Sequence, residues 1–488
     1  MERVLTRTST FLSRAAYAVF LLILAVAVAV GFQNSLSSDW KGVLLCVALA
    51  LAVGVPVLYG AGTLAGKLGA RKSLLILLGI CLVVKSAWVL TCSIEPASDY
   101  LNFYNVAQEL MGQPPLERAR DFALFPHILG YAWFLSLFMR VFGTGLLVPA
   151  FLNVVLSVVS AAALFYLGMK LSGLRTATAA VLLWSVCPSQ TMYNMFVLSE
   201  PYYTALTLLF LCLIVWLNGR NKLPWYAMAG LGVLAGILLG AINAARPIAA
   251  ILPIGLVLWL GLLRTHDWNG KEFRQKWAVF LVLMMAAWML FASVWGNYLF
   301  RWLEQDQSSI SGYNVYVGLN VESNGAWNEE DNARMQAYKT EPGSNAIWLH
   351  EQMLEDAKER LENMDGATLL RLLGQKMRIF LWKDSMCVQY GVSVLEHPGV
   401  LNYICNGFYH AVMLLSFAAV VLLLKRGDRS LLFMPMVYVI GLTMAQMLVE
   451  VAGRYHYSIV PMFCLLGAWF VSRLSWKRRK GKDFGQGI

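Results

Sequence analysis

Apolar blocks of about twenty residues, separated by short polar turns, run through most of this sequence and restrict what it can fold into. Hydrophobic residues make up 58% of the 488 residues, and charged residues only 14%. A helix of about 20 apolar residues crosses the hydrocarbon core of a bilayer with every backbone polar group paired internally. The blocks therefore predict an all-α, polytopic membrane protein. About twelve spans are predicted, near residues 15–34, 42–63, 73–94, 147–169, 176–197, 201–218, 225–243, 247–263, 277–298, 408–424, 430–449 and 455–472.

Basic residues gather on one side of these spans. The amino-terminal tail, every second turn and the carboxy-terminal tail hold 23 of the 39 Lys and Arg but only 5 of the 28 Asp and Glu. Because cytoplasmic loops are enriched in Lys and Arg, both termini are predicted to lie in the cytoplasm, in a multi-pass protein of the plasma membrane. The net charge of +11 is then a signal of topology and not of nucleic-acid binding.

Two long segments interrupt the spans, and both are predicted to lie outside. The sequence of segments is 1–94 (three spans), 95–146 (first outer loop), 147–298 (central spans), 299–407 (large outer loop), 408–472 (last spans) and 473–488 (basic tail). Apolar residues recur at helical spacing in 125–143 and 366–382, which predicts interfacial helices in both outer loops. Cys387 and Cys405 fall in the second loop, where a disulfide is conceivable but spacing alone does not establish it.

Four charged residues stand at the outer ends of predicted spans: Asp99, Glu200, Arg246 and Arg454. The topology derived from Lys and Arg counts places all four on one face. Unpaired charge is costly at a membrane boundary, so two acids and two arginines in short apolar turns indicate a polar cavity there.

Each of these residues has a functional and a structural interpretation. Asp99 is either a general base for a hydroxyl acceptor or part of a helix cap formed with Ser98. Glu200 either orients the acceptor or a metal, or complements the dipole of the helix that it begins. Arginine suits phosphate because its donors are fixed and it stays charged. Arg454, which lies four residues after Glu450, could instead form a helical ion pair.

Other residues are weaker candidates. Tyr455 and His456 follow Arg454 and add donors beside it. Lys85 lies within a span, where snorkelling or a structural pair is favoured over chemistry. His127 is predicted to pack at the interface, and "WNEEDN", residues 327–332, to be a solvated loop rather than a metal site. The sequence has no Gly-rich phosphate loop, zinc motif or serine nucleophile elbow, which argues against soluble nucleotide chemistry.

The outer segments resemble the GT-C glycosyltransferases that use lipid-phosphate sugars. The resemblance is carried by "SDYLNFYNVAQELMG" and "LFPHILGYAWFLSLFMRVFG" in the first outer loop, then by "SEPYY", "ARP" and "GRYHYSIVP", in that order along the chain. The nearest groups are bacterial relatives of the protein O-mannosyltransferases and the aminoarabinose transferases of lipid A. Each motif is weak alone, but their order and common side make the resemblance specific.

The resemblance implies a GT-C type bundle that moves a sugar, with inversion, from a polyprenyl phosphate such as undecaprenyl phosphate to an acceptor hydroxyl outside the cell. Asp99 matches the loop base, with Glu200 as the second acid, and Arg246 and Arg454 would hold the lipid phosphate, with Lys376 and Arg378 as weaker candidates. Acceptor or sugar contacts are expected from Tyr100, Tyr104, Tyr455 and His456. No cofactor is expected, and a divalent metal is not indicated.

The chain also departs from the family pattern. Protein mannosyltransferases commonly follow the loop Asp with Glu, whereas Tyr100 stands here, so transfer of mannose to protein is not carried over. The donor sugar stays open, and the acceptor is a lipid, a polymer or a protein. Two alternatives remain: a flippase or transporter of lipid-linked sugars, which would not need Asp99, and a ligase that transfers whole oligosaccharides from a lipid diphosphate.

Overall fold

The computed structural model describes residues 2–35, 40–218, 220, 223–264, 270–308, 311–426 and 431–483, with side chains omitted at 2–8, 34–35 and 475–483. Some charges used in the orientation argument lie outside these residues, among them Lys222, Asp267, Asp428 and Arg429, as do most side chains of the predicted basic tail. Every regular element within the described ranges is helical, which confirms the all-α prediction. Nine of these helices are long and apolar enough to span a bilayer.

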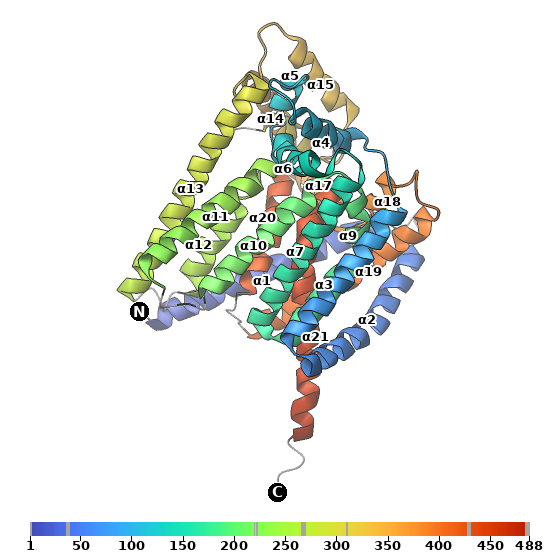
Figure 1. The fold of residues 1–488 in the computed structure, drawn as a ribbon, viewed down its shortest axis with the longest axis vertical. Helices are drawn as coiled ribbons and strands as arrows, with labels where there is room; N and C mark the ends of the chain where they lie inside the picture. Colours follow the sequence, from blue (N-terminus) through green and yellow to red (C-terminus); the bar gives the residue numbers. More distant parts are fainter. Residues whose placement is uncertain are drawn as a thin grey trace.

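Those nine correspond to nine of the predicted spans. They are α1 (Glu2–Ser35), α2 (Trp40–Leu68), α3 (Ala70–Thr91), α7 (Leu147–Ser172), α10 (Glu200–Asn218), α11 (Trp225–Ala245), α13 (Lys271–Leu303), α19 (Pro398–Arg426) and α21 (Val460–Asp483), the last continuing the 3-10 segment η3 (Gly453–Ile459). The chain is thus a multi-pass integral membrane protein. Figure 1 shows α3, α7, α10, α11 and α19 running together, while α4, α5, α14 and α15 gather at one end of the bundle.

Two predicted spans, 247–263 and 430–449, form helices that are too short to cross a bilayer alone. Helix α12 (Ile251–Leu263) has 13 residues and α20 (Phe433–Leu448) has 16. At 1.5 Å per residue these measure about 20 and 24 Å, against a hydrocarbon core of about 30 Å. The prediction erred because hydropathy counts apolar residues and does not register where the backbone leaves the helix. At the cavity end, 247–250 and Val449 are not helical, and Pro247, Ile248 and Val449 line the cavity described below.

The predicted span at 176–197 is wrong as a continuous helix. Helix α8 (Leu174–Ser185) ends before Pro188, which begins the short helix α9 (Pro188–Met192), and η1 (Tyr193–Met195) follows. Proline has no N–H to donate and disfavours helical backbone in the residue before it. Side chains satisfy part of the freed backbone: the Asn194 amide donates to the carbonyls of Gln190 and Thr191 at 2.9 and 3.0 Å. Buried protein surroundings permit such irregular backbone at membrane depth.

The outer segments fold into short helices. The first contains α4 (Ser98–Glu109), α5 (Ala119–Ala123) and α6 (His127–Phe142). The second contains α14 (Gly312–Gly318), α15 (Glu329–Thr340), α16 (Ala346–Glu362), α17 (Gly366–Leu381) and α18 (Met386–Tyr390). The helices predicted within 125–143 and 366–382 are therefore present as α6 and α17. Their position at a membrane interface stays a prediction.

The acidic run "WNEEDN" was predicted to be a solvated loop, and this is wrong. It forms the start of α15, where the Asn328 side chain caps the helix by accepting from the N–H of Asp331 at 2.9 Å. Asp331 itself is fully buried and pairs with Arg360 of α16 at 2.6 Å. The loop prediction erred because the partner of the buried acid lies 29 residues further along the chain.

Helices α11 and α13 pack along a row of glycines. A Cβ atom on Gly236 would lie 2.3 Å from the Met284 carbonyl oxygen and 2.7 Å from the Ala287 Cβ atom. Small residues at this spacing let two membrane helices approach closely, which compensates for the lack of a hydrophobic driving force between them in lipid. Figure 1 shows the long α13 at the edge of the bundle beside α11.

We expect Gly236→Leu to lower the free energy of unfolding by about 1–3 kcal/mol, because the new side chain forces the two helices apart. Gly230→Leu is the matched control, since a Cβ atom there meets nothing within 4 Å and leucine favours a helix. Thermal unfolding midpoints of the detergent-purified variants measure both effects. Equal midpoints for the two variants would contradict close α11–α13 packing.

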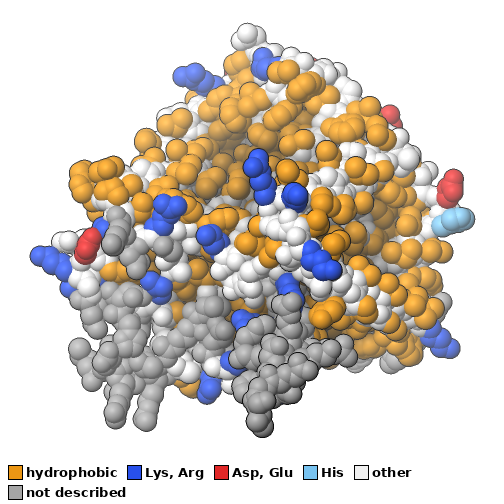
Figure 2. Space-filling view, turned by 60° about the horizontal axis from the view of Figure 1, so that its bottom comes forward, with side chains coloured by type: hydrophobic (Ala, Val, Ile, Leu, Met, Phe, Trp, Pro, Cys, Tyr) orange, Lys and Arg blue, Asp and Glu red, His pale blue; other side chains and the backbone are white. Residues whose placement is uncertain are grey.

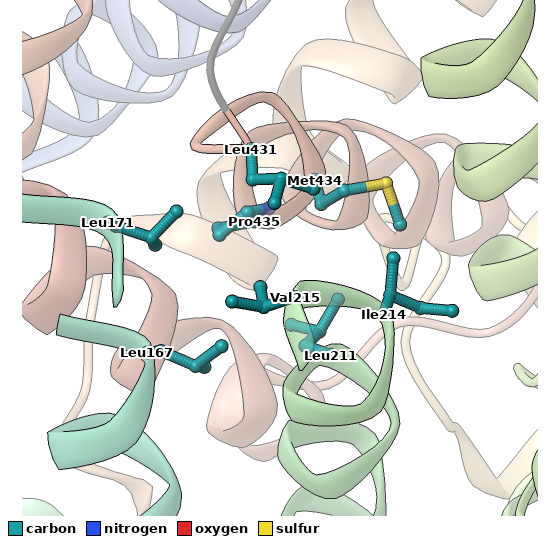
Figure 3. Close-up of a pocket in the computed structure, with 8 residues that line it drawn as sticks. All are labelled: Leu167, Leu171, Leu211, Ile214, Val215, Leu431, Met434 and Pro435. Carbon is teal, nitrogen blue, oxygen red and sulfur yellow. The ribbon is translucent and has the colours of Figure 1, made fainter. Parts of the chain in front are cut away.

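The end of the bundle opposite α4 and α15 is basic. Figure 2 shows Lys and Arg side chains spread over this face, with few Asp or Glu. The α2–α3 and α7–α8 turns, which lie at this end of the bundle, carry Lys67, Arg71, Lys72, Lys170 and Arg175. On the same side, α7, α10 and α20 enclose a small apolar gap of about 10 Å³ (Figure 3), lined by residues such as Leu167, Leu211 and Met434. With no polar group in its lining, this gap offers no chemistry.

Candidate functional site

A cavity of about 1030 Å³ opens at the end of the bundle where the outer helices lie. It is lined by the start of α4, the start of α6, the residues after α11, the 311–335 segment, the end of α17 with the loop and α18 after it, and residues 445–455, which run from the end of α20 into η3. All of these elements lie in, or at the edges of, the predicted outer turns and outer loops. Asp99, Arg246 and Arg454 all contribute to the lining.

Asp99 and Arg454 form an ion pair in this cavity, although 355 residues separate them. The carboxylate of Asp99 lies in the first turn of α4, where it complements the helix dipole, and its side chain is 52% exposed. The guanidinium of Arg454 is only 9% exposed. Ala97 occupies the cap position and no side chain caps α4, so the cap interpretation of Asp99 does not hold. The carboxylate therefore lines the cavity, where it pairs with Arg454.

Glu200 lies on the buried side of the same arginine. As the first residue of α10 it is 2% exposed, and its Oε1 atom is 3.7 Å from Nε of Arg454. Arg454 therefore stands between two carboxylates, one in the cavity and one behind it. The structure does not contain the helical ion pair considered for Glu450 and Arg454, because residues 449–452 are not helical. Glu450 instead accepts a hydrogen bond from the Tyr455 hydroxyl at 3.2 Å.

Aromatic rings surround the guanidinium of Arg454. Its Cζ atom lies 5.4 Å from the centre of the Tyr100 ring, 5.9 Å from that of Tyr390 and 5.5 Å from that of Tyr455. Burial raises the pKa of Tyr100 and of Tyr390, so both remain neutral phenols. Rings of this kind hold a cation by their quadrupole without neutralising its charge. Tyr390 was missed in the sequence because it follows a weakly patterned loop.

Arg246 supplies a second guanidinium at the cavity. It follows α11 directly, and its Cζ atom lies 3.9 Å from the centre of the Tyr455 ring. In the part of the chain that the structure describes, no carboxylate lies within 4 Å of Arg246. Two further cations, Arg378 and Lys383, line the same cavity and likewise face no carboxylate within 4 Å among the described residues. Lys383 was missed because it lies just beyond the predicted interfacial helix.

Two titratable groups at the cavity rim have shifted pKa values. Burial, and then the charge of Arg246, lower the pKa of His127 to about 4. Burial also raises the pKa of Glu450. Both side chains line the cavity, so the prediction of simple interfacial packing for His127 left out its exposure to the site.

The pKa of His127 predicts a response to acid. An unfolded histidine has a pKa of about 6.5, so between that value and 4 the unfolded chain binds more protons than the folded one and stability falls as pH falls. At pH 5 this preferential protonation lowers the free energy of unfolding of the wild type by about 2 kcal/mol, and we expect His127→Asn to abolish that loss. The measurement is the loss in thermal midpoint between pH 7 and 5, with the exposed His397→Asn as control. Equal losses in wild type and His127→Asn would contradict a neutral, partly buried imidazole.

Several sequence-predicted residues lie away from the cavity lining. Lys376 donates to the carbonyls of Gly318 and Met447, both at 2.9 Å, and burial lowers its pKa to about 8. The Tyr104 hydroxyl donates to the Thr144 carbonyl. The structure thus does not bring Lys376 or Tyr104 to the two arginines.

His456 is also directed away from the cavity. Its Nδ1 atom lies 2.6 Å from the Phe380 carbonyl oxygen, and its Nε2 atom lies 3.1 Å from the buried carboxylate of Asp384. The Ser189 hydroxyl donates to the same carboxylate. This cluster joins η3 to the loop after α17 and to α9, and so it holds the segment that carries Arg454.

Lys85 is fully buried within α3. Its Nζ atom lies 3.5 Å from the Thr191 hydroxyl oxygen and 5.1 Å from the centre of the Trp184 ring. Snorkelling is therefore excluded, and the lysine makes structural contacts inside the bundle. The thiols of Cys387 and Cys405 are both free. In the described ranges, no group of three or more His, Cys, Asp or Glu side chains is placed to hold a metal ion.

Comparisons with known proteins give similarity of structure only. No protein-family model matches the sequence, and no curated protein sequence does. The Archaeoglobus fulgidus oligosaccharyltransferase, solved with Zn and sulfate, is 14% identical over 84% of this chain, with a TM-score of 0.47. The same organism's AglB, solved with an inhibitory peptide and a dolichol-phosphate, is 13% identical over 87% of this chain, also with a TM-score of 0.47.

The chain spans about half the length of these oligosaccharyltransferases, covering 50% and 53% of them. ArnT from Cupriavidus metallidurans, solved with undecaprenyl phosphate, is 14% identical over 86% of this chain and 81% of its own length, with a TM-score of 0.35. At these values no residue role follows from the similarity. The structure is similar to those of GT-C glycosyltransferases, as the ordered sequence motifs predicted.

Proposed function

We propose that this protein is a membrane glycosyltransferase that moves a sugar from a polyprenyl phosphate to a hydroxyl group of an acceptor outside the cell. The observation that carries the proposal is the cavity itself. It holds a half-exposed carboxylate, Asp99, paired with the buried Arg454, next to cations that face no carboxylate among the described residues. A base beside an unneutralised anion site is what transfer from a phosphate leaving group requires.

The cations are suited to the lipid phosphate. Arginine offers planar donors that match phosphate oxygens in pairs. Arg246 and Arg378 lie in the lining with no acid among the described residues to compete for them, and Lys383 is exposed beside them. Their positive charge stabilises the phosphate as it leaves the sugar, so no strong general acid is needed. We assign the donor phosphate to these residues together with Arg454.

Asp99 is assigned the role of base. In the transfer step the Asp99 carboxylate takes the proton of the acceptor hydroxyl, whose oxygen forms a bond to the anomeric carbon. The bond from that carbon to the phosphate oxygen breaks, and its electron pair leaves with the polyprenyl phosphate. Arg454 contacts Asp99 in the structure, so an arriving phosphate that engages Arg454 would leave the carboxylate available to the acceptor. Glu200 keeps Arg454 in place from behind.

The face on which the cavity opens is part of the proposal. The basic turns lie at the end of the bundle opposite α4, as Figures 1 and 2 show. Since basic turns lie in the cytoplasm, the cavity would face outside. Nucleotide sugars are not normally available there, which favours a lipid-linked donor.

Lipid binding tests the phosphate site. We expect Arg246→Gln to retain about tenfold less undecaprenyl phosphate than wild type, because it loses charge-assisted hydrogen bonds to phosphate. The measurement is native mass spectrometry of detergent-purified protein incubated with undecaprenyl phosphate and excess phosphatidylglycerol. Arg220→Gln, at the other end of α10, is the control. Equal retention by both variants, or retention of phosphatidylglycerol only, would refute the assigned donor site.

A further inference from the structure

The outer wall of the cavity differs in chemistry from the rest of its lining. This wall is the part lined by residues of the 311–335 segment, and the side chains that it contributes carry no formal charge. It presents the indole of Trp327 and the amides of Asn314 and Asn332. The cations of the cavity all come from other segments. A ligand at this wall therefore meets a flat aromatic face and neutral hydrogen-bonding groups.

Trp327 is held in place although it is exposed. Two residues before it, Gly325 has a φ of +75°, and its carbonyl accepts from the N–H of Val451 at 2.9 Å. A Cβ atom on Gly325 would lie 2.9 Å from the Gly318 carbonyl oxygen, so the turn requires glycine. The residue after Trp327, Asn328, caps α15. Between these two anchors the Trp327 side chain remains 57% exposed at the cavity.

A second observation points to a ligand with hydroxyl groups. Gln446 of α20 lines the cavity and is 4% exposed, and its Oε1 atom has no hydrogen-bond partner among the described residues. A buried amide oxygen without a donor is unfavourable, so such a group indicates a donor supplied from outside the chain. The N–H of Glu450 donates to the Asn314 carbonyl at 2.7 Å, which ties the end of α20 to the outer wall.

We propose that the outer wall is a subsite for a neutral sugar ring of the acceptor, which makes the acceptor a glycan or glycolipid. The inference rests on the proposed function. The apolar face of a pyranose packs on an exposed indole, and its hydroxyl groups pair with amides such as those of Asn332 and Gln446. A charged sugar would find no counter-ion on this wall. The lipid phosphate is assigned to the cations of the other segments, so the wall is left to the acceptor.

Saturation-transfer NMR on the full, detergent-purified chain tests the subsite. The probes are the methyl glycosides of glucose, galactose, mannose and N-acetylglucosamine, with methyl glucuronide and the peptide Ala-Asn-Ala for comparison. We expect at least one neutral glycoside to be saturated, with a loss of fivefold or more in Trp327→Ala, partial recovery in Trp327→Phe and a smaller loss in Gln446→Leu. Trp225→Ala, which removes a 69% exposed indole at the start of α11, is the control and should lose nothing.

Specific results would overturn the proposal. These are no saturation of any neutral glycoside, equal losses in Trp327→Ala and Trp225→Ala, or Trp327-dependent signals from the glucuronide or the peptide instead. Hexose 1-phosphates distinguish the source of the sugar. Dependence of their signal on both Trp327 and Arg246, with no effect on methyl glycosides, would assign the wall to the donor sugar and refute the acceptor assignment.

The same samples separate this inference from the proposed function. Trp327→Ala should retain undecaprenyl phosphate as wild type does, because Trp327 lies outside the cations assigned to phosphate. The wild-type protein could bind glycosides through Trp327 and yet retain no undecaprenyl phosphate. That result would refute the donor assignment and would still support the sugar subsite.

Discussion

Asp99→Asn is expected to reduce sugar transfer by about 10²–10⁴-fold while leaving undecaprenyl phosphate binding unchanged, because a general base contributes that much to the rate. The amide keeps the size of the carboxylate and can still accept a hydrogen bond from Arg454 through its oxygen. It cannot take up the proton of an acceptor hydroxyl. The variant should therefore bind the donor and fail to use it.

The lipid that co-purifies with each protein measures this effect whatever the acceptor is. Asp99→Asn should carry a polyprenyl phosphate that still bears its sugar, and the added mass identifies the sugar class, whereas wild type should carry the free polyprenyl phosphate. Asp121→Asn is the control, since that carboxylate pairs with Lys339 on the outer helices and does not line the cavity. Free polyprenyl phosphate in Asp99→Asn at the wild-type level would refute Asp99 as the base.

Arg454→Met is expected to lower both the free energy of unfolding and the retention of undecaprenyl phosphate. Removing the guanidinium leaves Glu200 buried without its partner, and breaking one side of a buried ion pair costs about 3–5 kcal/mol. The lost donors should also reduce retention of undecaprenyl phosphate. These two effects have different causes, so a single substitution cannot tell a structural arginine from one that binds phosphate.

A double variant separates the two. Glu200→Gln combined with Arg454→Met removes both buried charges, and we expect it to recover most of the thermal midpoint lost by Arg454→Met. Retention of undecaprenyl phosphate should remain about tenfold below wild type. If the double variant regains lipid binding together with stability, Arg454 supports the fold only and the phosphate assignment passes to Arg246. If the thermal midpoint of Arg454→Met equals that of wild type, the buried pair of Arg454 with Glu200 does not stabilise the fold.

Much of the architecture could be predicted because its cause is local. A bilayer requires long apolar helices, so nine spans could be located from hydropathy alone. The distribution of Lys and Arg over the turns predicted that four charged residues lie on one side of the membrane, namely Asp99, Glu200, Arg246 and Arg454. The structure brings these four together at one end of the bundle. The segments that became α12, α20 and the broken helix before Glu200 were misjudged, because their ends depend on how irregular backbone is satisfied by distant groups.

The pairing of side chains could not be predicted in the same way. Glu450 was the nearest acid to Arg454 in sequence, yet its carboxylate accepts from Tyr455 and the arginine pairs with Asp99. Asp331 is predicted to be solvated until the fold places Arg360 against it. No sequence pattern marks Trp327, Lys383 or Gln446, because a single indole, lysine or amide near an outer segment is common and acquires meaning only from the cavity that it lines.

The sequence by itself determined that this chain spans a membrane with helices, how its basic turns divide the two faces, and which charged residues stand at the ends of the spans. These properties follow from hydropathy and charge, which act on each segment separately. Only the tertiary structure decided that Asp99 and Arg454 form a pair, that Glu200 lies behind them, and that an uncharged wall closes the cavity. Contacts between residues hundreds of positions apart depend on how all the helices pack together, and no local pattern records that packing.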